Sequence, residues 1–248
     1  AAKPLFALLD KLALARLDVV GAWTFTTQSI TQHATRLRAT AWSALGKLDG
    51  LKPTLSGSLS LASTIPGAGA GGAVPTGSLG SWVKAGAFTS LMVLDQSAGG
   101  VLLADAALAK AVSIPFIMTL PKGPAPSTGF PVVLFQHGFF RDRHDLLPLA
   151  NALAKAGMAA VSFDVIYHGA RAWCTSDAHC EAGTCVTQTG ACTSGKLKTD
   201  AAGLPYASGA RLLNTDDPVA LRDSFYQNQV DAVALLRAEC GVSTAAAV

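Results

Sequence analysis

The sequence lacks the long apolar run that a membrane-spanning helix needs. Its richest apolar segment, residues 101–112, is interrupted by Asp105 and Lys110, whereas a helix that crosses a bilayer needs about 18 or more apolar residues. Charged residues are also few, at 14% of 248, and the formal net charge of +3 comes without a block of Lys or Arg. We therefore expect no transmembrane segment and no nucleic-acid partner.

The hydrophobic content of the chain indicates that it folds. Half of its residues are hydrophobic, which is more than a disordered or solvating tail contains. A chain of this length buries a sizeable core and forms one large domain or two small ones. The composition therefore predicts a folded globular protein.

Four of the five cysteines gather in one polar segment, at Cys174, Cys180, Cys185 and Cys192. The residues between them are mostly small and polar, so the segment has little apolar surface with which to fold. Two disulfides would order it and would indicate an oxidising compartment. The alternative is a zinc site with His179, although the spacings lack the paired C-x2-C of structural zinc sites. We predict disulfides and no metal or cofactor; three pairings stay open.

The first third of the chain, residues 1–86, predicts an accessory region. Residues 3–17 are loosely helical in pattern, and residues 18–27 are rich in β-branched and aromatic residues, as strands are. Apolar residues at spacings of three and four predict a helix over residues 29–48. The Gly- and Pro-rich residues 65–80 predict a loop.

Alternating strands and helices are predicted in the second part of the chain. Residues 88–95 and 112–120 favour strands. Residues 130–136 are nearly all apolar, which is typical of a central strand that is covered on both faces. A helix over residues 146–156 and a second buried strand over residues 158–166 follow.

A polar insert, residues 172–216, separates these elements from a long helix. Asp217 and Pro218 predict the start of that helix, which runs over residues 219–240. Buried strands that alternate with helices predict an α/β fold with a mostly parallel sheet over residues 87–248.

The run FPVVLFQHGFF, residues 130–140, resembles the α/β-hydrolase superfamily, and the resemblance covers roughly residues 88–240. The matching features follow in order: a strand that ends in His137 and Gly138, a strand that ends in Asp164, a loop with His168, Gly169 and Arg171, and a helix with Arg222, Gln229 and Asp231. With the N-terminal region, the chain is similar to bacterial secreted lipases that have a virulence-factor-lipase type N-terminal region. Cysteine-rich inserts that it resembles often pair the first cysteine with the third and the second with the fourth.

The resemblance implies a catalytic role for the turn after the first of these strands. The backbone N–H of Phe139 would stabilise an oxyanion, Gly138 would let the chain turn sharply, and His137 would support the turn. The alternative is that Gly138 only ends a strand while Phe139 and Phe140 fill the core.

The same resemblance implies a substrate pocket. Phe140, His168 and Arg171 would line it, because His168 and Arg171 follow the next strand on the side where α/β sheets bind ligands. The alternative for the last two is an ordinary loop histidine and a surface arginine.

The sequence contains no Gly-x-Ser-x-Gly nucleophile motif. In the family order the nucleophile follows the helix over residues 219–240, so the resemblance implies that the Ser-Asp-His triad lies on a C-terminal half of the same precursor. Without that half, the strand over residues 130–136 would have an open edge. We therefore expect the N-terminal part of a bacterial serine ester hydrolase, secreted or associated with the outer membrane or cell surface, that acts on a hydrophobic ester. The alternatives are a non-catalytic binding or structural protein and a serine peptidase of the same fold.

Overall fold

The structure is a computed structural model that describes residues 77–240, the strand Leu59–Leu61 and isolated residues nearer the N-terminus. The chain divides into two compact units, residues 1–36 and 37–248, and all elements below belong to the second. The predicted strand over residues 18–27, the helix over 29–48 and most of the loop over 65–80 lie outside the described residues.

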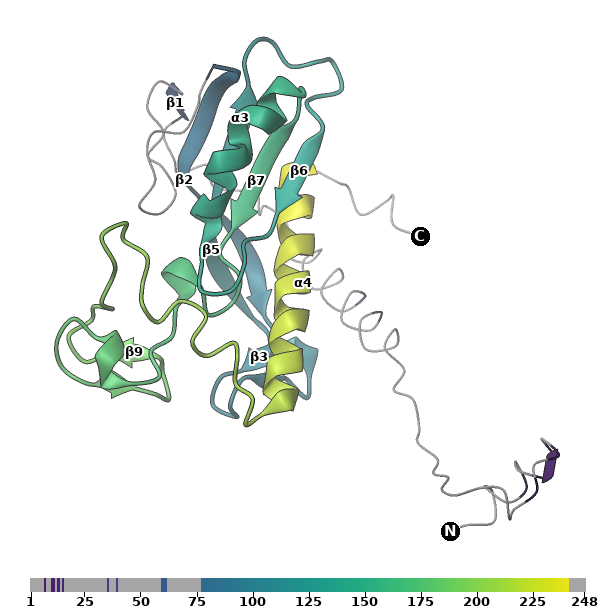
Figure 1. Cartoon of the computed structure of the whole chain (residues 1–248), viewed down its shortest axis with the longest axis vertical. Coiled ribbons are helices and arrows are strands. Elements are labelled where there is room, and N and C mark those ends of the chain that lie inside the picture. Colours follow the sequence, from purple (N-terminus) through teal and green to yellow (C-terminus); the bar gives the residue numbers. More distant parts are fainter. Residues whose placement is uncertain are drawn as a thin grey trace. The chain divides into compact units, whose positions relative to one another are not determined.

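A mixed sheet forms the centre of the second unit (Figure 1). Its described strands, in spatial order, are β1 (Leu59–Leu61), β2 (Leu79–Met92), β5 (Lys110–Pro121), β7 (Ala159–Phe163) and β6 (Val132–Phe135). Only β6 and β7 pair in parallel, and the other three pairings are antiparallel. The prediction of a mostly parallel sheet is therefore wrong for the described strands. A parallel pair needs a crossover connection, and among the consecutive described strands of this sheet only β6 and β7 are joined by an α-helix, α3 (Leu147–Lys155).

Shorter elements occupy the connections. Among the described residues they are two hairpins and four 3-10 helices. The hairpins are β3 (Leu94–Asp95) with β4 (Val101–Leu102) and β8 (Cys185–Val186) with β9 (Ala191–Cys192), and the 3-10 helices are η2 (Ala106–Leu108), η3 (Arg143–Leu146), η4 (Gly169–Arg171) and η5 (Asp177–His179). The predicted boundary between residues 86 and 87 falls inside β2, which runs without interruption through both residues.

Both predicted helices of the second part form, and local signals set their ends. Helix α3 (Leu147–Lys155) stops before Gly157, whose φ of 76° is the left-handed conformation that ends helices. Helix α4 (Pro218–Cys240) begins after Asp217, whose Oδ1 accepts the N–H groups of Val219 and Ala220. No helix among the described residues is long and apolar enough to cross a membrane.

The two helices cover opposite faces of the sheet. Alternate residues of a strand point to opposite faces, and on β5 the side chain of Phe116 packs in one buried cluster with Leu235 of α4. Its neighbour Ile117 packs in a second cluster with Leu147 of α3. The domain therefore has three layers, with helix, sheet and helix, and a core on each side of the sheet.

Strand β6 is at the edge of the described sheet. It pairs with β7 alone, and its first residue, Val132, is 43% exposed although it is apolar. All five residues of β7 are buried instead. Residues 130–136 therefore have the open edge that the sequence predicts for them when no further strand pairs with them.

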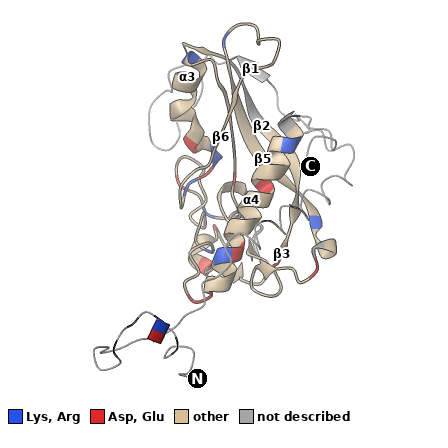
Figure 2. Cartoon of the chain, turned by 90° about the vertical axis from the view of Figure 1, so that its right-hand side faces the viewer, with Lys and Arg blue, Asp and Glu red and all other residues tan. Residues whose placement is uncertain are grey.

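Charges of both signs are interspersed on the described ribbon (Figure 2). Four arginines form ion pairs with nearby aspartates, Arg141 with Asp145, Arg143 with Asp164, Arg171 with Asp231 and Arg222 with Asp223. Two of these aspartates, Asp164 and Asp231, have no exposed surface, so their pairs are part of the interior.

Candidate functional site

The candidate site begins with His137, directly after β6. Its ring is buried, and its Nε2 accepts the N–H of Val165, at 3.2 Å. Because Nε2 accepts, the proton of the neutral ring is on Nδ1, which lies 2.8 Å from the carbonyl oxygen of Gly138 and donates to it. The ring thus ties the turn after β6 to the chain after β7, which is the supporting role that the resemblance implies for it.

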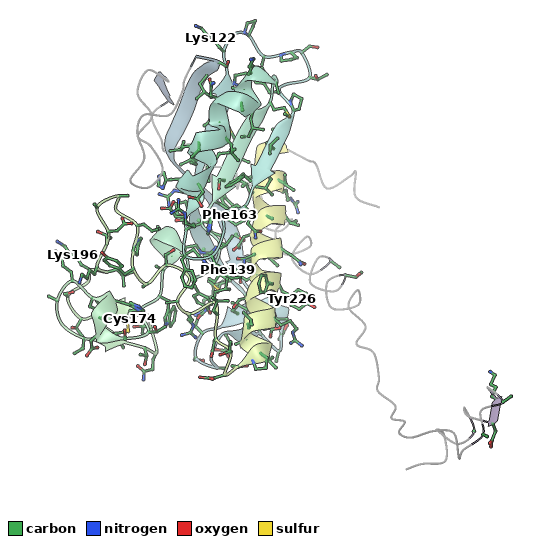
Figure 3. The ribbon with its side chains drawn as sticks, in the orientation of Figure 1. Lys122, Phe139, Phe163, Cys174, Lys196 and Tyr226 are labelled. Atoms are coloured by element: carbon green, nitrogen blue, oxygen red, sulfur yellow. A yellow bond between two sulfur atoms is a disulfide. The ribbon has the colours of Figure 1, made fainter. Side chains whose placement is uncertain are left out.

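The turn itself holds two backbone donors that have no acceptor among the described residues. Phe139 and Phe140 have side chains that are 45% and 52% exposed, and no group among the described residues accepts their N–H groups. Figure 3 shows Phe139 near the middle of the domain. Both N–H groups are therefore without a protein partner among the described residues.

The conformation of the turn depends on Phe140 rather than on Gly138. Phe140 has a φ of 60°, which is unusual for a bulky residue, whereas Gly138 is not among the residues with positive φ. A β-carbon on Gly138 would meet no heavy atom within 4 Å. The prediction that Gly138 allows the sharp turn is therefore corrected. The left-handed backbone of Phe140 is imposed by the structure around it, because a bulky residue rarely adopts this conformation by itself.

His168 lies beneath this turn. It is 1% exposed, and its ring centroid lies 5.0 Å from that of His137 and 6.4 Å from that of Phe139. Its Nδ1 donates to the carbonyl oxygen of Ile166, at 2.9 Å, and its buried Nε2 has no partner among the described residues. Burial lowers the pKa of His168 to about 4, since the charged form would lose its hydration. The ring is therefore neutral at pH 7.

The end of the insert completes the site, which the sequence did not indicate. Gly209 has a φ of 75°, and a β-carbon there would stand 2.6 Å from Nε2 of His168 and 2.9 Å from the backbone nitrogen of Phe140. Its neighbour Ser208 accepts the N–H of Gly169 and donates to the carbonyl oxygen of Arg141. The insert therefore closes on the turns after both β6 and β7.

Arg171 is held by buried carboxylate and carbonyl groups. Its Nη1 donates to Oδ2 of Asp231, at 2.7 Å, and to the carbonyl oxygen of Asp164, and its side chain is only 10% exposed. Asp164 in turn accepts from the backbone and the guanidinium of Arg143 and from the N–H of Ala170. These contacts make Arg171 part of the buried frame of the loop, and its place in a substrate pocket stays a prediction.

Helix α4 contributes polar residues that sequence reasoning missed. The side chain of Gln227 accepts from the N–H of Val93 and donates to Asp231, and Asn228 accepts from the N–H of Ile166. Gln229, which the resemblance pointed to, is exposed. The amide side chains of Gln227 and Asn228 were the signal in the sequence that could have pointed to them. The spacing of residues along a helix does not by itself tell which polar residues are buried.

The cysteines form two disulfides, Cys174–Cys185 and Cys180–Cys192. This confirms the predicted disulfides and the pairing of first with third and second with fourth. Three of the sulfur atoms lie within 4.8 Å of one another, but sulfur in a disulfide is not the thiolate that binds zinc.

No family model matches the chain, and no curated protein matches its sequence. Among solved structures it is similar to an acetyl xylan esterase from Paenibacillus sp. R4, with 16% sequence identity and a TM-score of 0.38. The likeness covers 89% of this chain and 49% of that protein, so the chain spans about half the length of that esterase. A likeness this distant establishes no activity for the chain.

Proposed function

We propose that this chain is the oxyanion-binding part of a serine ester hydrolase that acts on hydrophobic esters. The observation that carries the proposal is the exposed turn at the carboxyl end of β6, where the N–H groups of Phe139 and Phe140 have no acceptor among the described residues. The two exposed aromatic rings at the same turn favour an apolar substrate.

The chemistry follows from what an ester needs. Its carbonyl oxygen becomes negatively charged when a nucleophile attacks the carbonyl carbon, and backbone N–H groups that are already oriented stabilise this charge. The bonds of His137 to Val165 and Gly138 hold the turn in one arrangement. Gly209 allows the close contact of His168 with the turn. These contacts support a rigid, preorganised donor site.

The nucleophile in this proposal belongs to a further segment of the same precursor, which pairs with the free edge of β6. The strand has one neighbour among the described strands, carries no charged side chain, and leaves Val132 exposed, which favours pairing with another strand. A parallel strand at that edge would end beside the turn at Phe139. A serine at its end would then reach a carbonyl bound there.

The two disulfides favour a secreted or cell-surface location for this enzyme, because disulfides persist in oxidising compartments. The proposal involves no metal ion or cofactor, since ester hydrolysis by a serine nucleophile needs neither.

The test compares Phe139→Pro with Phe139→Ala in the native protein, purified with any polypeptide bound to it. Proline removes the N–H, so turnover of p-nitrophenyl butyrate should fall by ~10²–10³. Alanine keeps the N–H and removes only the ring, so its turnover should fall far less. Circular dichroism checks that both variants fold.

Two results would contradict the proposal. A folded Phe139→Pro variant with full turnover would remove the oxyanion role from this turn. A native assembly that neither hydrolyses the ester nor reacts with a serine-directed fluorophosphonate would favour the non-catalytic binding protein instead.

A further inference from the structure

A pocket of about 500 Å³ lies between the cysteine-rich first half of the insert and the residues that lead into α4. This volume is in the range of sites that bind small molecules. Its lining comes from three parts of the chain: Gly99 in the turn between β3 and β4, the first half of the insert with Trp173 and Thr187, and residues between 210 and 217, among them Arg211.

Arg211 is the one cationic residue in this lining. Its guanidinium carbon lies 4.1 Å from the ring centroid of Trp173 and 5.1 Å from that of Tyr167. No carboxylate or carbonyl among the described residues accepts a hydrogen bond from it. Four other described arginines pair with aspartates, so Arg211 differs from them in having donors to offer a ligand.

The rings that hold the guanidinium are themselves fixed. The hydroxyl of Tyr167 donates to Gln96, at 3.0 Å, and the indole N–H of Trp173 donates to the carbonyl oxygen of Thr187, at 3.0 Å. Gly190 packs so closely on Trp173 that a β-carbon there would stand 2.0 Å from the ring. A guanidinium held in this way loses little freedom when it binds a ligand.

The lining favours a carboxylate that also carries hydroxyl groups. A guanidinium with free N–H groups matches the planar geometry of a carboxylate, and the hydroxyl and amide groups of Thr175, Thr187 and Asn214 suit neutral hydroxyls. Asp217 uses Oδ1 to cap α4, and Asp216 is exposed beside it. Two aspartates in one lining disfavour a doubly charged phosphate more than a singly charged carboxylate.

We propose that this pocket binds a hydroxylated monocarboxylate, such as a sugar acid, with the carboxylate on Arg211 and the hydroxyls on the neutral lining. The proposal rests on the pocket and on the unpaired guanidinium of Arg211, and it does not depend on the proposed hydrolase activity. It would exist in a non-catalytic protein as well.

Calorimetric titration of the full, oxidised chain with glucuronate and galacturonate tests the proposal. Glucose and inorganic phosphate serve as the neutral and doubly charged probes. At least one of the two uronates should bind, and Arg211→Gln should weaken its binding by about 10- to 100-fold, as expected for the loss of hydrogen bonds to a charged group.

Lys122→Gln is the matched control for charge. It removes one positive charge from an exposed side chain, and Figure 3 shows Lys122 at the opposite end of the domain from Cys174, which lines the pocket. Its binding of the uronate should stay within about twofold of the unmodified protein, since a distant surface charge is screened.

Thr215→Trp separates loss of binding from loss of folding. Thr215 is exposed and lines the pocket, so an indole there fills the space while Arg211 and its rings stay intact. The variant should fold and should also lose uronate binding. The proposal is overturned if neither uronate binds the unmodified protein, if Arg211→Gln or a folded Thr215→Trp binds as tightly, or if glucose or phosphate binds as tightly as the uronate.

Discussion

Protonation of His168 should destabilise the fold as the pH falls below 7. Burial lowers the pKa of His168 from its ordinary value of 6.5 to about 4 in the folded protein. Between these values the unfolded chain binds a proton at this ring that the folded chain does not bind. Stability therefore rises with pH across this window and is lost as the pH falls through it.

The size of the effect follows from the two pKa values. One pKa unit corresponds to about 1.4 kcal/mol, so the full difference amounts to roughly 3 kcal/mol, reached below pH 4. Between pH 7 and pH 5 the free energy of unfolding should fall by about 2 kcal/mol because of this residue. The ring is 1% exposed, so solvent offers the imidazolium little compensation.

Urea unfolding at pH 7 and at pH 5, followed by circular dichroism, measures this loss. His168→Gln removes the titrating group. The fall in unfolding free energy from pH 7 to pH 5 should therefore be about 2 kcal/mol smaller in this variant than in the unmodified protein. Only the change with pH is compared, because the substitution has its own constant cost in the core.

His144→Gln is the matched control, since the ring of His144 is 37% exposed and lies beside Asp142. It should keep the loss of stability between pH 7 and pH 5, because His168 is still present. The reasoning would be refuted if His168→Gln kept the full pH dependence, or if a nuclear magnetic resonance titration found the His168 ring protonated at pH 6 in the folded chain.

Two further predictions concern the support of the site. Gly209→Ala should destabilise the fold by about 2 kcal/mol more than Gly203→Ala, because both residues have left-handed φ but only at Gly209 would a β-carbon collide with His168; equal losses in thermal unfolding would contradict this. Asp231→Leu should cost about 3–5 kcal/mol in urea unfolding, because it leaves the guanidinium of Arg171 buried without its carboxylate; a loss below about 1 kcal/mol would show that the pair does not hold the loop.

Most elements of the second unit could be predicted from local sequence. The strands over β5 and β7 follow from apolar runs, and helix α4 begins where Asp217 and Pro218 predict it. The disulfides follow from four cysteines in a segment with little apolar surface. These signals are sufficient because a cap, a run or a pair of nearby cysteines acts on neighbours in the chain.

The edge position of β6 was decided by tertiary structure. Strands β6 and β7 are both apolar runs of similar length, yet β7 is fully buried and β6 is not. The difference lies in the number of strands beside each, and a neighbouring strand can come from any distance along the chain.

The site itself also depends on tertiary structure. His168 and Gly209 are far apart in sequence, and their contact exists only because the insert folds back on the turns after β6 and β7. Gln227 is buried whereas Gln229 is exposed, a difference that the rotation of α4 against the sheet determines. Composition and the spacing of residue types along the chain by themselves determined the main strands, the helices and the disulfides of this protein. Which polar groups meet was decided by packing between distant segments, because hydrogen bonds and burial depend on proximity in space.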